Sequence, residues 1–112
     1  MTINEGMEQL YKLGRLVKKI DRRLARIAYK EGHGRERECL LDIRRTLQDT
    51  IKYLAKEASE YISTVDDPIL RDVLSMRYIA CMSWRSVAYA IKGNTTDSVR
   101  MIVKRHWKEK RG

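Results

Sequence analysis

The chain has 112 residues, enough for one domain or for a small domain with a helical extension. Its 24 lysines and arginines against 15 acidic residues give a formal net charge of +9, which favours a polyanionic partner, nucleic acid first. No apolar run approaches the length of a membrane span, and the segment MTINEGMEQL lacks the basic start and apolar middle of a signal peptide. We therefore expect a cytoplasmic protein without a membrane partner.

The first predicted helix covers about residues 4–30. Apolar residues recur there at spacings of three and four, a stripe that needs a partner helix to cover it. The stripe consists of Leu10, Leu13, Val17, Ile20, Leu24 and Ile27. Gly14 weakens this helix by about 1 kcal/mol relative to alanine. The sequence Glu31-Gly32-His33-Gly34 then indicates a flexible turn, with His33 in solvent.

A second long helix is predicted over about residues 35–62. Its apolar stripe consists of Leu40, Ile43, Leu47, Ile51, Leu54, Ala58, Tyr61 and Val65. Two amphipathic helices joined by a short turn predict an antiparallel hairpin over residues 1–65. A remaining apolar face of this hairpin would dock on the C-terminal helices or on a second copy of the chain. We interpret the hairpin as a surface for dimerisation or partner docking.

Cys39 and Cys81 are the two cysteines of the chain. Each lies in an apolar-periodic segment, and neither has metal-ligand spacing to another cysteine or to a histidine. We therefore predict that both are reduced, buried, small apolar residues, and that the protein binds no metal.

Residues 66–112 predict a second unit of three shorter helices, near 68–81, 84–91 and 96–109. Asp67 is a good N-cap and Pro68 suits the first position of the helix that follows. Ser83 is the expected N-cap of the next helix. The break between the last two helices comes at Lys92-Gly93-Asn94, and Thr95 or Thr96 would cap the last one.

The last helix has two distinct faces. Its apolar face carries Val99, Ile102, Val103, His106 and Trp107. We expect a half-buried neutral histidine at position 106 and core anchors at Tyr78, Trp84 and Trp107. The chain is thus predicted to be all-α, with a long N-terminal antiparallel helical hairpin followed by a three-helix unit that ends in a helix-turn-helix.

Three short stretches of this unit carry a resemblance to a known family. They are DPILRDVLSMRYI at 67–79, SWRSVA at 83–88 and SVR at 98–100. Together they resemble the DNA-binding region four of bacterial sigma factors, and more closely the sigma-like domains of small phage-encoded transcriptional regulators of the RinA and ArpU types. The matching positions are Leu74, Arg77, Tyr78, Ser83, Trp84, Val87, Ala88 and Val99. Ser86 departs from the family pattern, which usually has glutamate there.

The resemblance covers about residues 66–110 and leaves no room for the polymerase-binding and promoter-melting regions of a complete sigma factor. It implies a phage or prophage regulator in the cytoplasm of a bacterial host cell, with the hairpin in place of those regions. Double-stranded DNA is the implied partner, and RNA polymerase is a second candidate partner.

The outer face of the last helix would then meet DNA. Arg100 is the best candidate base reader, because a guanidinium can donate to O6 and N7 of guanine together. Lys104, Arg105 and Lys108 suit phosphates, which give affinity and register. Asp97 is interpreted as a favourable acid at the helix N-terminus, and the alternative is that it accepts a hydrogen bond from N4 of a cytosine. The full set of predicted DNA-binding residues is Arg85, Lys92, Thr95, Thr96, Ser98, Arg100, Met101, Lys104, Arg105 and Lys108.

Two other functions are compatible with the same features. A small terminase subunit also pairs a helix-turn-helix with oligomerising helices, and an adaptor could dock on RNA polymerase without depending on DNA. An enzyme is not expected, since no glycine-rich phosphate loop and no catalytic cluster is present, and no cofactor is implied. A DNA-binding regulator of this kind usually reads two half-sites, so a homodimer joined through residues 4–62 is predicted.

Overall fold

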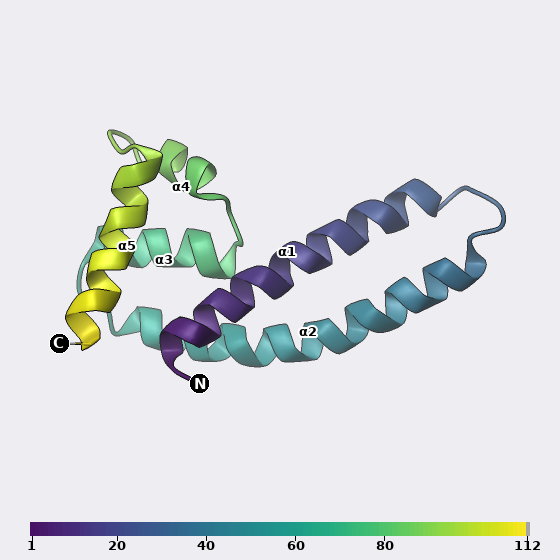
Figure 1. Cartoon of the computed structure of the whole chain (residues 1–112), viewed down its shortest axis with the longest axis horizontal. Helices are drawn as coiled ribbons and strands as arrows, with labels where there is room; N and C mark the ends of the chain where they lie inside the picture. Colours follow the sequence, from purple (N-terminus) through teal and green to yellow (C-terminus); the bar gives the residue numbers. More distant parts are fainter. Residues whose placement is uncertain (112) are drawn as a thin grey trace.

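The computed structural model describes residues 1–111, without the side chain of Arg111 (Figure 1). Gly112, the last residue of the predicted C-terminal unit, lies outside the described residues. The elements are α1 (Ile3–Ile27), α2 (Gly34–Ser63), α3 (Pro68–Leu74), the π-helical turn η1 (Ser75–Ile79), α4 (Trp84–Ala90) and α5 (Thr96–Arg111). No strand occurs within residues 1–111, so the predicted all-α fold is confirmed.

Side-chain caps fix where the C-terminal helices begin. Asp67 Oδ1 accepts hydrogen bonds from the backbone N–H of Ile69 at 2.9 Å and of Leu70 at 3.4 Å. Ser83 Oγ accepts from the N–H of Ser86 at 3.2 Å. Of the two candidate caps for the last helix, it is Thr95 whose hydroxyl accepts from the backbone, the N–H of Ser98, at 3.1 Å. The caps predicted at positions 67 and 83 are confirmed.

Helices α1 and α2 run antiparallel, side by side, over most of their length (Figure 1). Leu10, Ile20 and Ile27 of the α1 stripe are buried, as the apolar spacing predicted. Met7 is also fully buried and extends the stripe one turn toward the N-terminus. Ile43 was predicted to share the buried face of α2, but it is 49% exposed, because two helices alone cover only a narrow stripe of each other.

The turn between the two helices is tied down by polar contacts. Arg23 Nε of α1 donates to Glu36 Oε1 of α2 at 2.6 Å. His33 Nδ1 lies 3.1 Å from the other carboxylate oxygen, so this histidine is half-buried and contacts Glu36, which corrects the expectation that it sits in solvent. The hydrogen bonds from Arg23 and His33 hold the pKa of Glu36 at about 2.

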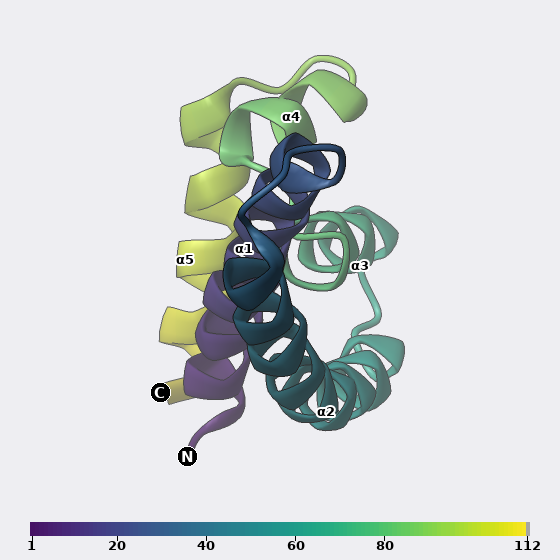
Figure 2. The same ribbon diagram turned by 90° about the vertical axis from the view of Figure 1, so that its right-hand side faces the viewer.

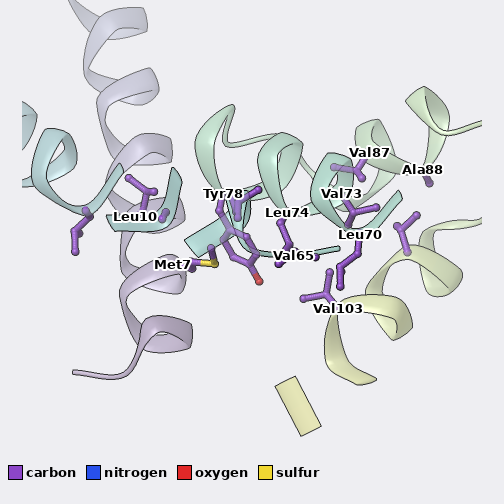
Figure 3. Packing of buried hydrophobic residues seen from close by; sticks show 14 residues of the cluster. Met7, Leu10, Val65, Leu70, Val73, Leu74, Tyr78, Val87, Ala88 and Val103 are labelled. Carbon is purple, nitrogen blue, oxygen red and sulfur yellow. The ribbon is translucent and has the colours of Figure 1, made fainter. Parts of the chain in front are cut away.

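One hydrophobic cluster joins the base of the hairpin to the C-terminal helices (Figure 3). Its members come from α1, α2, α3, η1, α4 and α5. Val65, in the segment that joins α2 to α3, is also a member. The largest fully buried side chains in it are Tyr78, Met7, Leu10, Leu74, Val73, Val87 and Val99. Beyond this cluster the rest of α1 and α2, about residues 15–50, extends away from the C-terminal helices as a two-helix arm (Figure 1).

The helix predicted over residues 68–81 is interrupted. The α-helical part ends at Leu74, and the chain continues as the π-helical turn η1, where the N–H of Ala80 donates to the carbonyl of Ser75 at 3.0 Å. Cys81 then adopts a positive φ of 55° and reverses the chain before Ser83. A π-helical turn depends on tertiary packing, so the apolar spacing of this segment does not indicate it.

The two cysteines differ in their surroundings. Cys81 is buried, as predicted, and burial raises the pKa of its thiol. Cys39 is exposed, so the prediction that it is a buried residue is wrong. It lies on the flank of α2 within the arm, where only one partner helix is available to cover it.

Helix α1 meets the reversal at Cys81 through Gly14. A methyl group at position 14 would overlap the Sγ of Cys81, so only glycine permits this approach. One turn further along α1, Lys18 Nζ donates to the carbonyls of Ala80 at 3.1 Å and Cys81 at 3.2 Å. The glycine that weakens α1 locally is therefore the position at which the C-terminal unit docks.

We expect Gly14→Ala to destabilise the protein by about 1–3 kcal/mol, because the added methyl group overpacks the contact with Cys81. The measurement is the free energy of unfolding from chemical denaturation. Gly14→Ala combined with Cys81→Ala should recover part of the loss, since the overlapping sulfur is removed.

Gly6→Ala is the matched control in the same helix. Its methyl group would meet only the side chains of Met1 at 3.7 Å and Leu54 at 3.9 Å, which is ordinary contact. Higher helix propensity should make this variant more stable by about 0.5–1 kcal/mol. Equal effects of the two alanine substitutions would contradict the close approach at Gly14.

Candidate nucleic-acid interface

Helices α4 and α5 are joined by a short turn and lie at one edge of the molecule (Figure 2). Gly93 adopts a positive φ of 84°, which glycine tolerates, and the N–H of Asn94 donates to the carbonyl of Ile91 at 3.3 Å. Ser98 Oγ donates to Asn94 Oδ1 at 3.0 Å and ties the turn to the first turn of α5. These contacts fix the direction in which α5 leaves the turn.

Helix α5 buries Val99 and Val103 in the hydrophobic cluster, as its apolar spacing predicted. Arg100, Lys104 and Lys108, which we call the α5 row, are exposed and follow one another at intervals of four residues. This spacing places them along one edge of the helix. All three line a groove of about 540 Å³ whose far wall is made by Asn4 and Glu8 of α1.

Three aromatic side chains line this groove. Tyr78, Trp84 and Trp107 line it together with Val103. Tyr78 donates its hydroxyl hydrogen to Glu8 Oε1 at 2.9 Å, and burial followed by the nearby Glu8 carboxylate raises the pKa of Tyr78. The groove is therefore lined by aromatic side chains and has a row of cations along α5.

The other residues of α5 that are predicted to contact DNA lie on two different sides of the helix. Met101 is 49% exposed and lies beside the α5 row. Arg105 lines a different hollow, together with Asp67, His106 and Glu109, so it is separated from Lys104 despite being next to it in sequence. The neighbouring residue on a helix is turned by about 100°, which accounts for this separation.

Two of the hydroxyl residues at the start of α5 form hydrogen bonds within the chain. Thr95 acts as the N-cap and Ser98 bonds both the cap and Asn94. Thr96 is half-buried in the first turn, and Asp97 is exposed there, where an acid is favourable.

Helix α4 and the turn present a second exposed surface. Arg85 and Lys92 are exposed, and Tyr89, four residues after Arg85, is 91% exposed. Tyr89 is not among the predicted DNA-binding residues. The signal was present, because the buried positions Val87 and Ala88 leave Arg85 and Tyr89 together on the opposite face of α4.

Arg77 is the residue that holds the start of α4 in place. Its guanidinium carbon lies 3.5 Å from the ring centroid of Tyr11 and 4.3 Å from that of Trp84, so it is sandwiched between two aromatic faces. Its Nη1 donates to the carbonyl of Met82 at 3.1 Å. The sequence named Arg77 as part of a motif, but its partner Tyr11 is distant in the chain and could not be found by spacing.

His106 lies on the partly buried side of α5. Its Nε2 is 2.6 Å from the hydroxyl of Tyr61, and Trp107 packs beside it, with ring centroids 4.8 Å apart. Burial, followed by the charge of Lys110, lowers the pKa of His106 below 6.5. The neutral ring therefore shares a hydrogen bond with the Tyr61 hydroxyl, and this contact attaches α5 to the end of α2.

This contact predicts a pH dependence of stability. The folded state holds the pKa of His106 below 6.5, so the unfolded chain takes up a proton first, and the free energy of unfolding should fall as the pH drops below 6.5. His106→Gln should make the curve flatter between about pH 7 and pH 5.5. His33→Gln, which removes the other histidine and leaves this contact intact, is the control. Identical pH dependence in the wild type and His106→Gln would contradict the assignment.

Within residues 1–111 no group of three or more histidine, cysteine, aspartate or glutamate side chains is arranged to hold a metal ion. None of the helices in the described part of the chain combines the length and hydrophobicity that a membrane span requires. Comparison with known proteins gives no matching family model, no matching curated protein and no matching solved structure.

Proposed function

We propose that this protein is a phage or prophage transcriptional regulator that binds double-stranded DNA through α5, in the cytoplasm of a bacterial host cell. The observation that carries the proposal is the α5 row, three exposed cations on one edge of a helix that follows a short turn. Such a helix can enter the major groove while the helix before it crosses the backbone. The sigma-like motifs of residues 67–100 support the same function by resemblance.

Each exposed residue has a distinct role in the proposed complex. Arg100 lies near the N-terminus of α5, where side chains reach base edges, and would donate to a guanine. Lys104 and Lys108 lie further along the same edge and would bind phosphates. Arg85 and Lys92, on α4 and in the turn, would contact the flanking backbone.

The first test of the proposal is the salt dependence of DNA binding. With roughly four to six phosphates neutralised, log K should fall against log salt with a slope of about −4 to −5. Bound sequences are first selected from a random DNA library. Fluorescence anisotropy with labelled duplexes of these sequences then measures the slope. Binding that barely changes between low and moderate salt would exclude the DNA assignment.

Alanine substitutions along α5 test the roles of single residues. Lys104→Ala should weaken binding to all sequences alike and reduce the salt slope by about 1. Arg100→Ala should in addition lose about 1–3 kcal/mol of discrimination at one base pair. Arg105→Ala is the matched control, because it removes the same charge from the same helix on the side of Asp67 and Glu109. A loss with Arg105→Ala as large as with Lys104→Ala would argue against recognition by the α5 row.

We also propose that the protein acts as a homodimer joined through residues 4–62. The arm supports this, since Leu16, Leu41 and Ile43 remain 40–49% exposed on it. Two copies would present two recognition helices to two half-sites, the usual way in which a helix-turn-helix gains affinity. RNA polymerase remains the alternative partner for the hairpin.

Light scattering of the intact protein over a range of concentrations tests the dimer. Leu16→Glu combined with Ile43→Glu should abolish dimerisation, because both side chains are exposed on the arm, whereas Val17→Glu combined with Leu24→Glu alters the stripe that faces α2 within the hairpin. Circular dichroism separates a lost interface, with helicity retained, from an unfolded hairpin. A wild-type monomer at high micromolar concentration that still binds a palindromic site tightly would contradict the dimer, and ring-shaped oligomers would favour a small terminase subunit.

A further inference from the structure

Helix α1 carries a second row of cations, most of it on the arm. Lys12, Arg15, Lys19, Arg22 and Arg26 recur at spacings of three and four residues, and all five are exposed. On a helix this spacing forms one continuous stripe. We call these five residues the α1 row. It spans about 21 Å, at 1.5 Å for each residue of helix.

The α1 row continues directly from the groove beside α5. Extended toward the N-terminus at the same spacing, it reaches Glu8 and Asn4, which form the wall of the groove opposite the α5 row. Near its start, the guanidinium of Arg15 lies 6.0 Å from the ring centroid of Tyr11, the ring that also stacks on Arg77. The two rows therefore lie on the same side of the molecule and meet at the groove.

Several other cations of the arm have partners within the chain. Arg23 pairs with Glu36, Arg44 with Asp21 and Arg45 with Asp42, while Lys18 donates to two backbone carbonyls. None of the α1 row forms a salt bridge with any residue in the described part of the chain. Several acids of the arm are thus paired with cations on other faces, whereas the α1 row keeps its full positive charge.

The charge balance of the chain agrees with this division. Residues 15–50 hold eleven lysines and arginines against six acids. The stretch from Ser83 onward holds eight against two, so the arm has nearly the same excess of positive charge. Like charges at intervals of three and four residues destabilise a helix in isolation. A polyanion bound along the stripe would remove that repulsion, and a duplex offers phosphates at regular intervals along its length.

We propose that the α1 row binds the phosphate backbone of the DNA that flanks the site read by α5, so that one protomer contacts the duplex with two separate elements. This inference rests on the proposed function, because it extends the same DNA complex. The arm then contributes affinity and orientation without reading sequence, since contacts to phosphates carry none.

The test compares two charge-matched triple variants. Lys19→Gln, Arg22→Gln and Arg26→Gln together remove three cations of the α1 row that lie away from the hydrophobic cluster. Arg37→Gln, Lys52→Gln and Lys56→Gln together remove three exposed cations from α2 and serve as the control. Glutamine keeps the helix propensity high, and circular dichroism checks that both variants are folded.

Binding is measured on two mixed-sequence duplexes. One has about 12 base pairs, roughly 40 Å, shorter than the 53 Å long axis of the molecule, and the other has about 30 base pairs. On the long duplex the α1 variant should bind more weakly than the wild type, with a salt slope smaller in magnitude by about 2 to 3. The control variant should keep most of the wild-type slope, and on the short duplex the α1 variant should approach the wild type.

Several results would overturn the inference. If the α1 variant binds the long duplex as the wild type does while Lys104→Ala binds weakly, the α1 row does not contact DNA and the proposed function stands. If the wild type itself shows no salt-dependent binding, both proposals fail. An equal loss in the two triple variants would show only an effect of net charge. Unchanged DNA binding with lost binding to purified bacterial RNA polymerase would assign the row to a protein partner.

Discussion

The close contact between Gly14 and Cys81 determines how the two parts of the molecule are arranged. Without a side chain at position 14, α1 approaches the chain reversal after η1, and Lys18 satisfies the two carbonyls that the reversal leaves open. The bond to Ala80 is exposed and the bond to Cys81 is partly buried, and the lysine supplies both acceptors of this irregular backbone with a charged donor. Together with the hydrophobic cluster, this contact sets the position of α4 and α5 relative to the arm, and with it the side on which both rows of cations lie.

Features that depend on neighbouring residues in the chain could be predicted from the sequence. Helix periods are visible over 25 and 30 residues in α1 and α2, and caps such as Asp67 and Ser83 act within three residues of their position. The α5 row was also accessible, because four-residue spacing on an amphipathic helix fixes a face. Predictions of this kind need only the next one or two turns of the chain.

Features that depend on distant residues were missed. The π-helical turn η1 and the positive φ of Cys81 follow from packing against α1, more than sixty residues earlier in the chain. The same holds for Arg77, whose ring partner Tyr11 lies on α1. Cys39 and Ile43 were assigned to a buried face because periodicity shows which residues share a face, whereas the width of the buried stripe depends on how many helices cover it.

Electrostatics connects the arm to α5 in a way that neither element shows alone. The α5 row and the α1 row are separated by the groove whose wall carries Glu8, and the hydrogen bond from Tyr78 holds that carboxylate at the groove wall. A phosphate backbone that follows both rows would pass this single acid at the point where they meet. Tyr78 is buried in the hydrophobic cluster, so the position of Glu8 is coupled to the core that joins arm and C-terminal helices. The core that stabilises the fold thereby also fixes the distance between the two cationic rows, and a rigid distance between two sites lowers the cost of binding both at once.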